Sequence, residues 1–288
     1  MALIPPFFMD CVAAIGTTDS QGEQHWVASG FLYGVRITND ANAPRQYRVY
    51  LVTNRHVFAD LPHAYLRFNP QADKPAREFH LELFDDAGKP LWYTHPDPAV
   101  DVAAMPIHFD LLQERGMQVA YFENDEHVAL LGMLNELGVT EGDFAYVLGF
   151  PMGLIGGARN SVIVRSGALA RVRDALAGAS NTFLVDAFVF PGNSGGPVIL
   201  KPEAVAIEGT RPQVVPYLIG LVQAYVPYDD VAISQQTGRP RVVFEENSGL
   251  AAVLPIDFVE ETIDAQTLPP VQRPARPAQS AANVEAED

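Results

Sequence analysis

Residues 190–200 read FPGNSGGPVIL, a serine enclosed by glycines and followed by a short apolar run. Glycine, proline and asparagine are typical of tight turns, so the segment by itself indicates a turn in which the serine caps backbone groups. A nucleophilic role for Ser194 requires more, because a serine hydroxyl is weakly reactive until an oriented base takes its proton. The rest of the chain must therefore offer a histidine and a carboxylate.

One of the seven histidines stands apart by its context. His56 lies in YLVTNRHVF, directly after an apolar run that is typical of a strand. The alternative interpretation is a partly buried histidine without a chemical role. The carboxylate candidate is Asp101 in DPAVDVAAMPI, which precedes a small apolar run; it could equally cap the start of a strand, and Asp97 competes with it.

The composition is that of an ordinary globular protein. The 288 residues, 48% hydrophobic and 19% charged, suffice for one large or two medium cores. The single cysteine, Cys11, excludes an intramolecular disulfide, so a reducing compartment is allowed and the cytoplasm is the expected location. The first residues show neither a basic segment nor a long apolar run, so no signal peptide is expected.

The net charge argues against two classes of partner. At -16 the chain repels phosphate backbones and anionic lipid, so neither nucleic acid nor a membrane is expected as a partner. No cofactor is expected either. GLIGGARN at 153–160 lacks the residues of a phosphate loop, and the histidines show no zinc-protease spacing, so no metal site is predicted.

Short runs rich in β-branched and aromatic residues predict an all-β sandwich or barrel. These runs cover residues 31–37, 47–53, 79–84, 144–150, 161–172, 182–190, 217–226 and 241–245. Helical patterns are confined to 126–137 and 257–265. The proline-rich residues 266–288 predict a disordered tail.

Three segments, in chain order, resemble the motifs of the trypsin-like serine endopeptidases. VTNRHV resembles the histidine motif, VDVAAM the aspartate motif and DAFVFPGNSGGPVI the serine motif, and the second of these selects Asp101 over Asp97. The closest resemblance is to the bacterial Deg/HtrA-type protease domain without a PDZ domain. VASGFLYG at 27–34, EGDFAYVLGFPMGL at 141–154 and GLAAVLPIDFVEE at 249–261 resemble further strands of the family.

The resemblance implies a chymotrypsin-like fold of two antiparallel β-barrels with a C-terminal helix. The peptidase domain would cover residues 8–265, with the first barrel at about 8–120, the second at about 140–256 and the closing helix at 257–265. Residues 110–140 would be an insertion of unassigned role. The oligomeric state is left open.

The resemblance also implies the chemistry. His56 would act as general base and then general acid, Asp101 would hold its imidazole, and Ser194 would attack a peptide carbonyl. The N–H groups of Gly192 and Ser194 would form the oxyanion hole. The expected partner is a protein or peptide substrate.

Two departures bear on regulation and specificity. Asn193 stands where digestive zymogens carry an aspartate, so no activation by N-terminal cleavage is expected. Phe188 would form the base of the primary pocket, and Gln223, Ala224 and Tyr225 its wall, which favours cleavage after small or medium apolar residues rather than after Lys or Arg. Gln223 also replaces a hydroxyl residue that supports the aspartate in much of the family.

Three hypotheses follow. The first is an active serine endopeptidase. The second is a catalytically silent, protease-like scaffold that binds peptides in its cleft. The third is an enzyme that stays latent until a partner orders the loops at 154–160 and 191–193.

Overall fold

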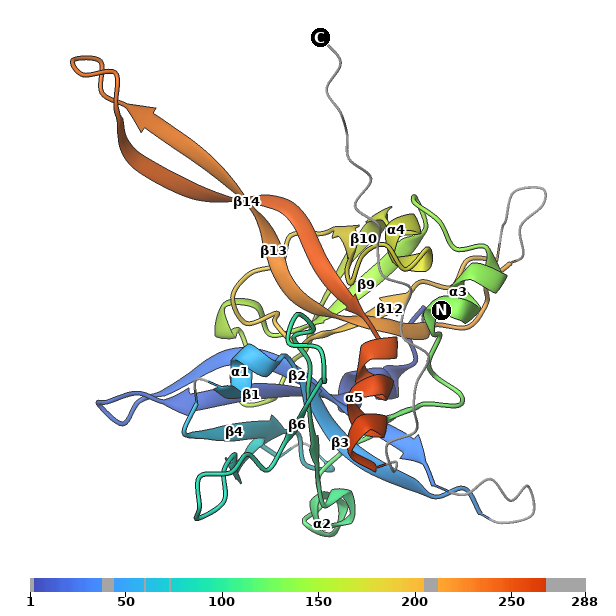
Figure 1. Cartoon of the computed structure of the whole chain (residues 1–288). Helices are drawn as coiled ribbons and strands as arrows, with labels where there is room; N and C mark the ends of the chain where they lie inside the picture. The colour runs from blue at the N-terminus through green and yellow to red at the C-terminus, as the bar shows by residue number, and fades with distance from the viewer. Residues whose placement is uncertain (1–2, 38–43, 60, 73, 205–211, 268–288) are drawn as a thin grey trace.

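The computed structural model describes residues 3–37, 44–59, 61–72, 74–204 and 212–267, and it consists mainly of β-strands (Figure 1). The strands form two groups that follow one another along the chain, which confirms the predicted all-β class. None of the described helices has the length and apolar character needed to cross a membrane.

The first group is an eight-stranded sheet in the order β5-β4-β1-β2-β3-β7-β6, with β8 paired to β2. Its strands are β1 (Val12–Thr18), β2 (Gln24–Arg36), β3 (Tyr47–Thr53), β4 (His63–Phe68), β5 (Arg77–Glu82), β6 (Tyr93–Thr94), β7 (Ala103–Pro106) and β8 (Phe122–Glu123). A bridge between Phe84 and Pro90 joins the segments after β5 and before β6. This isolated bridge brings the segments next to the two end strands together, and we call the sheet, with its core, the N-terminal barrel.

The second group is a closed barrel in the order β10-β11-β14-β13-β12-β9. Its strands are β9 (Phe144–Gly149), β10 (Ile163–Arg171), β11 (Phe183–Asp186), β12 (Pro197–Leu200), β13 (Tyr217–Ile233) and β14 (Pro240–Pro255). All its ladders are antiparallel. β13 and β14 are longer than the predicted runs and extend beyond the barrel as a hairpin (Figure 1).

Alternation of apolar and polar residues explains the cores. In β4, buried and partly exposed residues alternate, so one face of the strand packs inward. Each barrel encloses its own apolar cluster. A third cluster takes Phe31 and Tyr50 from the first barrel and Leu148 and Leu254 from the second, so it fills the space between the barrels.

Helices occupy the connections and the C-terminal end. They are η1 (Pro6–Cys11), α1 (Arg55–Ala59), α2 (Phe109–Glu114), α3 (Leu131–Leu137), η2 (Pro151–Gly153), α4 (Arg173–Leu176) and α5 (Asp257–Thr267). The predicted helix at 126–137 begins later, because His127 and Val128 instead pair with Leu218 of β13. α3 ends at Gly138, whose φ of 75° is the left-handed conformation that glycine adopts without cost.

The closing helix is two residues longer than predicted. α5 ends at Thr267, so the first two residues of the expected tail are helical. The remainder of that tail, residues 268–288, lies outside the described residues.

Candidate active site

His56 and Asp101 come from adjacent parts of the N-terminal barrel. β3 ends at Thr53, and His56 lies in the first turn of α1 that follows. β7 pairs with β3, which places Asp101, just before β7, beside the start of α1. The carbonyl of Asp101 accepts hydrogen bonds from the side chain of Asn54 at 2.9 Å and from the N–H of Arg55 at 3.4 Å, so this loop is fixed to the helix.

The two side chains are directly bonded. Nδ1 of His56 lies 2.6 Å from one oxygen of Asp101, and the backbone N–H of His56 donates to the other oxygen at 3.0 Å. A carboxylate in this position selects the tautomer in which Nδ1 carries the proton, so Nε2 is left with a lone pair. This arrangement can hold a base in a fixed orientation.

Burial and hydrogen bonding act in opposite directions on Asp101. Its burial disfavours the charged carboxylate, but the hydrogen bonds from the His56 ring and N–H, together with the charges of His56 and Arg55, outweigh that effect. The pKa of Asp101 is therefore lowered below its ordinary value. Asp101 is a carboxylate at neutral pH.

Ser194 comes from the C-terminal barrel, in the turn between β11 and β12. The turn is closed by hydrogen bonds from Asn193 N–H to Phe190 O at 2.9 Å and from Gly196 N–H to Asn193 O at 2.8 Å. The carbonyl of Ser194 accepts a hydrogen bond at 2.9 Å from the N–H of Ser29 in β2. This bond ties the turn to the N-terminal barrel.

Gly192 and Gly195 shape that turn, with φ of 100° and 79°. A Cβ on Gly195 would overlap Oγ1 of Thr53 and the carbonyl of Ser29. A Cβ on Gly192 would overlap the carbonyl of Phe150. Both positions therefore require glycine, for backbone conformation and for space.

Ser29 holds the peptide after Gly192 in one orientation. Its hydroxyl donates to the carbonyl of Gly192 at 2.6 Å and accepts from the N–H of Phe150 at 2.9 Å. Within the part of the chain that the structure describes, the N–H groups of Gly192 and Ser194 have no hydrogen-bond acceptor. Two backbone donors are thus left free beside the Ser194 hydroxyl, as an oxyanion hole requires.

A cavity of about 390 Å³ brings these groups together. Its lining residues are Val27, His56, Val189, Phe190, Pro191, Gly192, Ser194, Val222, Gln223, Ala224 and Tyr225. A larger cavity, of about 840 Å³, lies elsewhere on the N-terminal barrel, between β3 and the start of α2. Only the smaller cavity contains His56 and Ser194.

The hydroxyl of Ser194 is not bonded to the histidine. It donates to the carbonyl of Gln223 at 3.4 Å, and no hydrogen bond to His56 is formed among the described residues. Hydrogen bonds of this kind are often long or absent before a substrate is bound.

The residues predicted for the pocket wall lie in the cavity, whereas the residue predicted for its base lies outside it. Gln223, Ala224 and Tyr225 line the cavity with Ser194. Phe188, the expected base, is 54% exposed and does not line it. Ala187 and Val189 on either side are buried, so the side chain between them points outward.

The ring of Phe188 instead packs on the outside of the barrel. It stacks on Phe190, with ring centroids 6.4 Å apart, and lies against Gly249 of β14. The sequence position thus gave the right loop and the wrong side chain. Val189 and Phe190 line the cavity in its place, and the alternation of burial in this loop is a tertiary effect that spacing from Ser194 does not reveal.

Sequence reasoning also gave Ser29 no role. The residue lies within VASGFLYG, whose pattern predicts only a strand, and the available signal is a serine before a glycine in an otherwise apolar run. A second unassigned residue is Met152, whose φ of 56° is unusual for a residue with a side chain. Its N–H donates to the carbonyl of Pro191 at 2.6 Å, so Met152 supports the chain just before Gly192.

The loop at 154–160 is attached to the N-terminal barrel. Asn69 and Asn160 exchange two hydrogen bonds of 2.8 Å, one from each residue. Arg159 donates to the carbonyls of Ala72 and Lys74, at 2.7 Å and 2.9 Å. These hydrogen bonds hold the loop against the N-terminal barrel.

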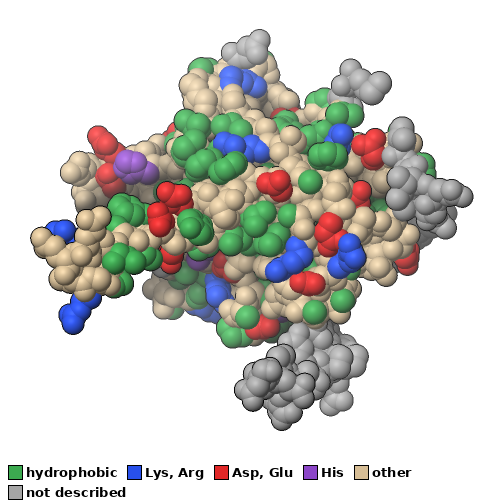
Figure 2. All heavy atoms as spheres, turned by 90° about the horizontal axis from the view of Figure 1, so that it is seen from above, with side chains coloured by type: hydrophobic (Ala, Val, Ile, Leu, Met, Phe, Trp, Pro, Cys, Tyr) green, Lys and Arg blue, Asp and Glu red, His purple; other side chains and the backbone are tan. Residues whose placement is uncertain are grey.

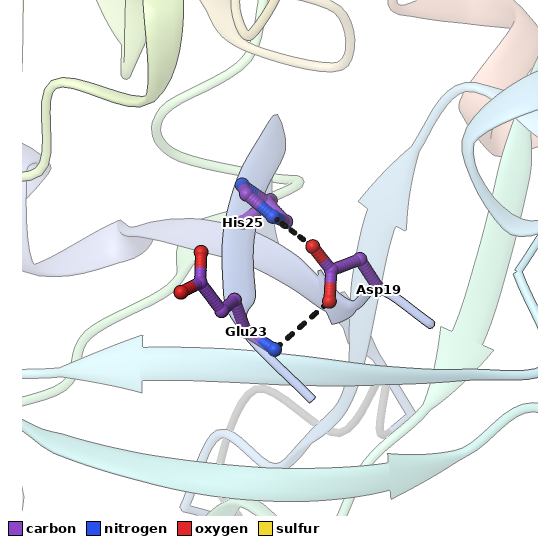
Figure 3. Close-up of side chains that lie close together, drawn as sticks. All are labelled: Asp19, Glu23 and His25. Atoms are coloured by element: carbon purple, nitrogen blue, oxygen red, sulfur yellow. Dashed lines mark hydrogen bonds and ion pairs between the residues drawn. The ribbon is translucent and has the colours of Figure 1, made fainter. Parts of the chain in front are cut away.

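Two groups of side chains in the described residues have the composition of a metal site, and both lie away from Ser194: Asp19, Glu23 and His25, and Glu123, Glu126 and His127. In the first group, His25 bonds to the carboxylate of Asp19 at 2.8 Å, and the N–H of Glu23 donates to it at 2.9 Å (Figure 3). All three residues are exposed at the turn between β1 and β2. The hydrogen bonds of a hairpin turn account for this arrangement.

One solved structure supports the fold, and a second is reported beside it. Human heparin binding protein matches with a TM-score of 0.50 at 12% identity, over 95% of this chain and 98% of that chain. The protease domain of MamO from Magnetospirillum magneticum, in its apo form, matches with a TM-score of 0.46 at 15% identity, over 88% of this chain and 96% of that chain. At these identities the similarity concerns the fold alone.

Sequence comparison identifies the family. No curated protein sequence matches the chain significantly. The family model described as "Trypsin-like peptidase domain" matches residues 28–206, which is more than half of the chain and includes His56, Asp101 and Ser194. This chain is a member of the trypsin-like peptidase domain family, with the chymotrypsin-like fold.

Proposed function

We propose that the protein is a serine endopeptidase with Ser194 as nucleophile. The observation that carries the proposal is the hydrogen-bonded pair of His56 and Asp101 in the same cavity as Ser194 and the free N–H groups beside it. A scaffold that only binds peptides has no chemical need for an oriented base next to a serine. Membership of the family supports the same reaction class.

Each group has one part in the reaction. Nε2 of His56 takes the proton of the Ser194 hydroxyl as the oxygen attacks the peptide carbonyl, and later gives this proton to the leaving amine. Asp101 stabilises the imidazolium that forms in between. The N–H groups of Gly192 and Ser194 donate to the negatively charged oxygen of the tetrahedral intermediate. Water then hydrolyses the acyl-enzyme by the same route.

The lining of the cavity supports a preference for apolar residues before the scissile bond. Val189, Phe190, Val222 and Tyr225 contribute apolar surface, and none of the lining residues is an aspartate or glutamate. A Lys or Arg side chain would enter this cavity without a counter-charge, at the cost of its hydration. We propose substrates with small or medium apolar residues at that position.

A second candidate is a latent or silent site, and one observation favours it. The Ser194 hydroxyl bonds to the carbonyl of Gln223 and not to His56. Rotation of the hydroxyl about the Cα–Cβ bond would be needed before His56 could take its proton. If that rotation requires a bound partner, the isolated protein binds peptides but does not cleave them.

A fluorophosphonate probe distinguishes the two candidates, because it reacts with a serine only where base and oxyanion hole are assembled. We expect one adduct, seen by intact mass, on the parent chain and none on Ser194→Ala. Ser20→Ala, in the exposed turn after β1, is the matched control and should label like the parent chain. Peptide hydrolysis should fall about a million-fold in Ser194→Ala.

Two results would contradict the proposal. An adduct that persists in Ser194→Ala would place the reactive group elsewhere. A parent chain that binds peptides but never forms the adduct would favour the silent scaffold.

A further inference from the structure

The hairpin of β13 and β14 continues well beyond the barrel. Its outer part, which we call the arm, comprises residues 227–233 of β13 and 240–247 of β14, paired from Pro227 with Asn247 to Ile233 with Pro240. Figure 1 shows the arm projecting from the body of the molecule. A two-stranded ribbon is at best marginally stable in water without further packing.

Large apolar side chains cover both faces of the arm. Tyr228, Val231, Ile233, Val242, Val243 and Phe244 are each at least 41% exposed. Since side chains alternate along a strand and paired residues share a face, Val231 and Val243 lie on one face and Phe244 on the other. Exposed apolar surface of this kind marks an interaction site.

Charges along the arm are segregated. The acidic residues Asp229, Asp230, Glu245 and Glu246 lie in the half next to the barrel, whereas Arg239 and Arg241 lie at the tip. In Figure 2 basic side chains stand at the outermost end of the side on which the arm projects, with hydrophobic side chains next to them. Basic residues at this place are notable in a chain of net charge -16.

We propose that the arm is a dimerisation element whose partner is the arm of a second copy of this chain, packed antiparallel about a two-fold axis. If the two-fold axis passes near the pair Val231–Val243, the pair Asp229–Glu245 lies two residue pairs from the axis toward the barrel. The pair Ile233–Pro240 lies two residue pairs from it toward the tip. This axis therefore sets Arg241 of each copy opposite Asp229 and Glu245 of the other. Each copy then uses the same surface of its arm, as a two-fold interface requires.

A second arm explains the surface better than an added peptide strand. A strand that pairs with the edge of β13 uses main-chain groups and leaves the apolar side chains on both faces exposed. A second ribbon lies across the face that carries Val231 and Val243 and removes these side chains from water. The opposed charges of tip and base also match a second copy of the arm, because the antiparallel arrangement brings unlike charges together.

The interface would border the candidate active site without covering it. Tyr225 lines the cavity, and its hydroxyl bonds to the carboxylate of Glu245 at the base of the arm. Dimerisation would order the arm, and this ordering would affect Tyr225 in the pocket wall through its hydrogen bond with Glu245.

Sedimentation velocity and light scattering of the full chain test the proposal. We expect a dimer at micromolar concentration that weakens as salt is added. Arg241→Glu should raise the dissociation constant by about tenfold or more, since the attraction of each Arg241 to Asp229 and Glu245 of the other copy becomes repulsion. Arg241→Glu combined with Asp229→Arg and Glu245→Arg should restore the dimer, because residue 241 and both of its partners are then reversed in charge.

The control is Arg171→Glu, which makes the same change of charge at an exposed residue of β10. It should leave the dimer intact. A parent chain that is monomeric at about 100 μM overturns the proposal, since the arm is expected to dimerise at micromolar concentration. A dimer that is unaffected by the arm substitutions, or a triple variant that stays monomeric while folded by circular dichroism, overturns it as well.

Discussion

Gly195 shows how a single residue positions Ser194, the proposed nucleophile. The glycine has a φ of 79° and sits where a Cβ would overlap Thr53 and the carbonyl of Ser29, both in the N-terminal barrel. The turn that carries Ser194 is therefore pressed against the barrel that carries His56. The close approach is possible because position 195 has no side chain.

The first prediction concerns this contact. Gly195→Ala should lower the free energy of unfolding by about 3 kcal/mol, because backbone strain and overlap with backbone atoms add. Gly238→Ala is the matched control: Gly238 has a φ of 67° but open space around it, so only about 1 kcal/mol of strain is expected. Urea unfolding measures both, and equal losses would show that the space behind Ser194 does not matter.

Much of the candidate site could be predicted from the sequence, and the reason is local. His56, Asp101 and Ser194 each lie at a strand end or in a glycine turn, and both features can be recognised in the sequence alone. Phe188 could not be placed in this way, because its direction depends on how Ala187 and Val189 pack. The orientation of the peptide after Gly192 depends on Ser29, which is far away in the sequence.

At the scale of elements, α5 is fixed to the N-terminal barrel through Glu260. Its carboxylate accepts hydrogen bonds from the hydroxyl of Tyr33 and from Asn124 at 3.2 Å. Burial raises the pKa of Glu260, the two hydrogen bonds lower it, and nearby carboxylates raise it further, so the net shift is upward. The helix is thus held by the carboxyl group of Glu260, whose charged form is disfavoured by burial.

The second prediction follows from the sign of that shift. A raised pKa means that the folded state binds the proton more tightly, so Glu260 reduces stability as pH rises from about 4.3 through its folded pKa. Glu260→Gln keeps an acceptor for Tyr33 and removes the charge. It should be the more stable protein at pH 7, and the difference should shrink below about pH 4 in urea titrations. A variant less stable at every pH would contradict this.

Element boundaries were less predictable than element types. Most of the predicted strands lie on observed ones, since β-branched runs are strong signals. Strands built from small or mixed residues, such as β1, were not predicted. In the arm, the predicted run at 241–245 lies on β14, whereas its partner at 227–233 was not predicted, because that pairing depends on β13 and β14 continuing without interruption from the barrel.

For the whole molecule, the loop around Arg159 joins the two barrels. Arg159 comes from the C-terminal half and donates to carbonyls at 72 and 74 in the N-terminal half. Asn69 and Asn160 form the neighbouring pair of hydrogen bonds. Together with the apolar cluster between the barrels, these contacts should make the protein unfold as one unit.

The third prediction tests this joint. Arg159→Ala should cost about 1 kcal/mol of unfolding free energy, because charge-assisted hydrogen bonds to the carbonyls of Ala72 and Lys74, both at the surface, are lost. Arg171→Ala removes only an exposed ion pair with Asp174 and should cost less than about 0.5 kcal/mol. Calorimetry should still show one transition in both variants, and two separate transitions would mean that the barrels are held together weakly.

The division of the site between the barrels has a further consequence. The base and its carboxylate belong to one half of the chain, and the serine with its backbone donors to the other. On the proposed mechanism, a protein cut in the segment between the barrels yields two fragments that are each inert. Labelling of Ser194 would then show that the two fragments have reassembled. The divided protein could therefore be used to detect binding between two molecules that are fused to its halves.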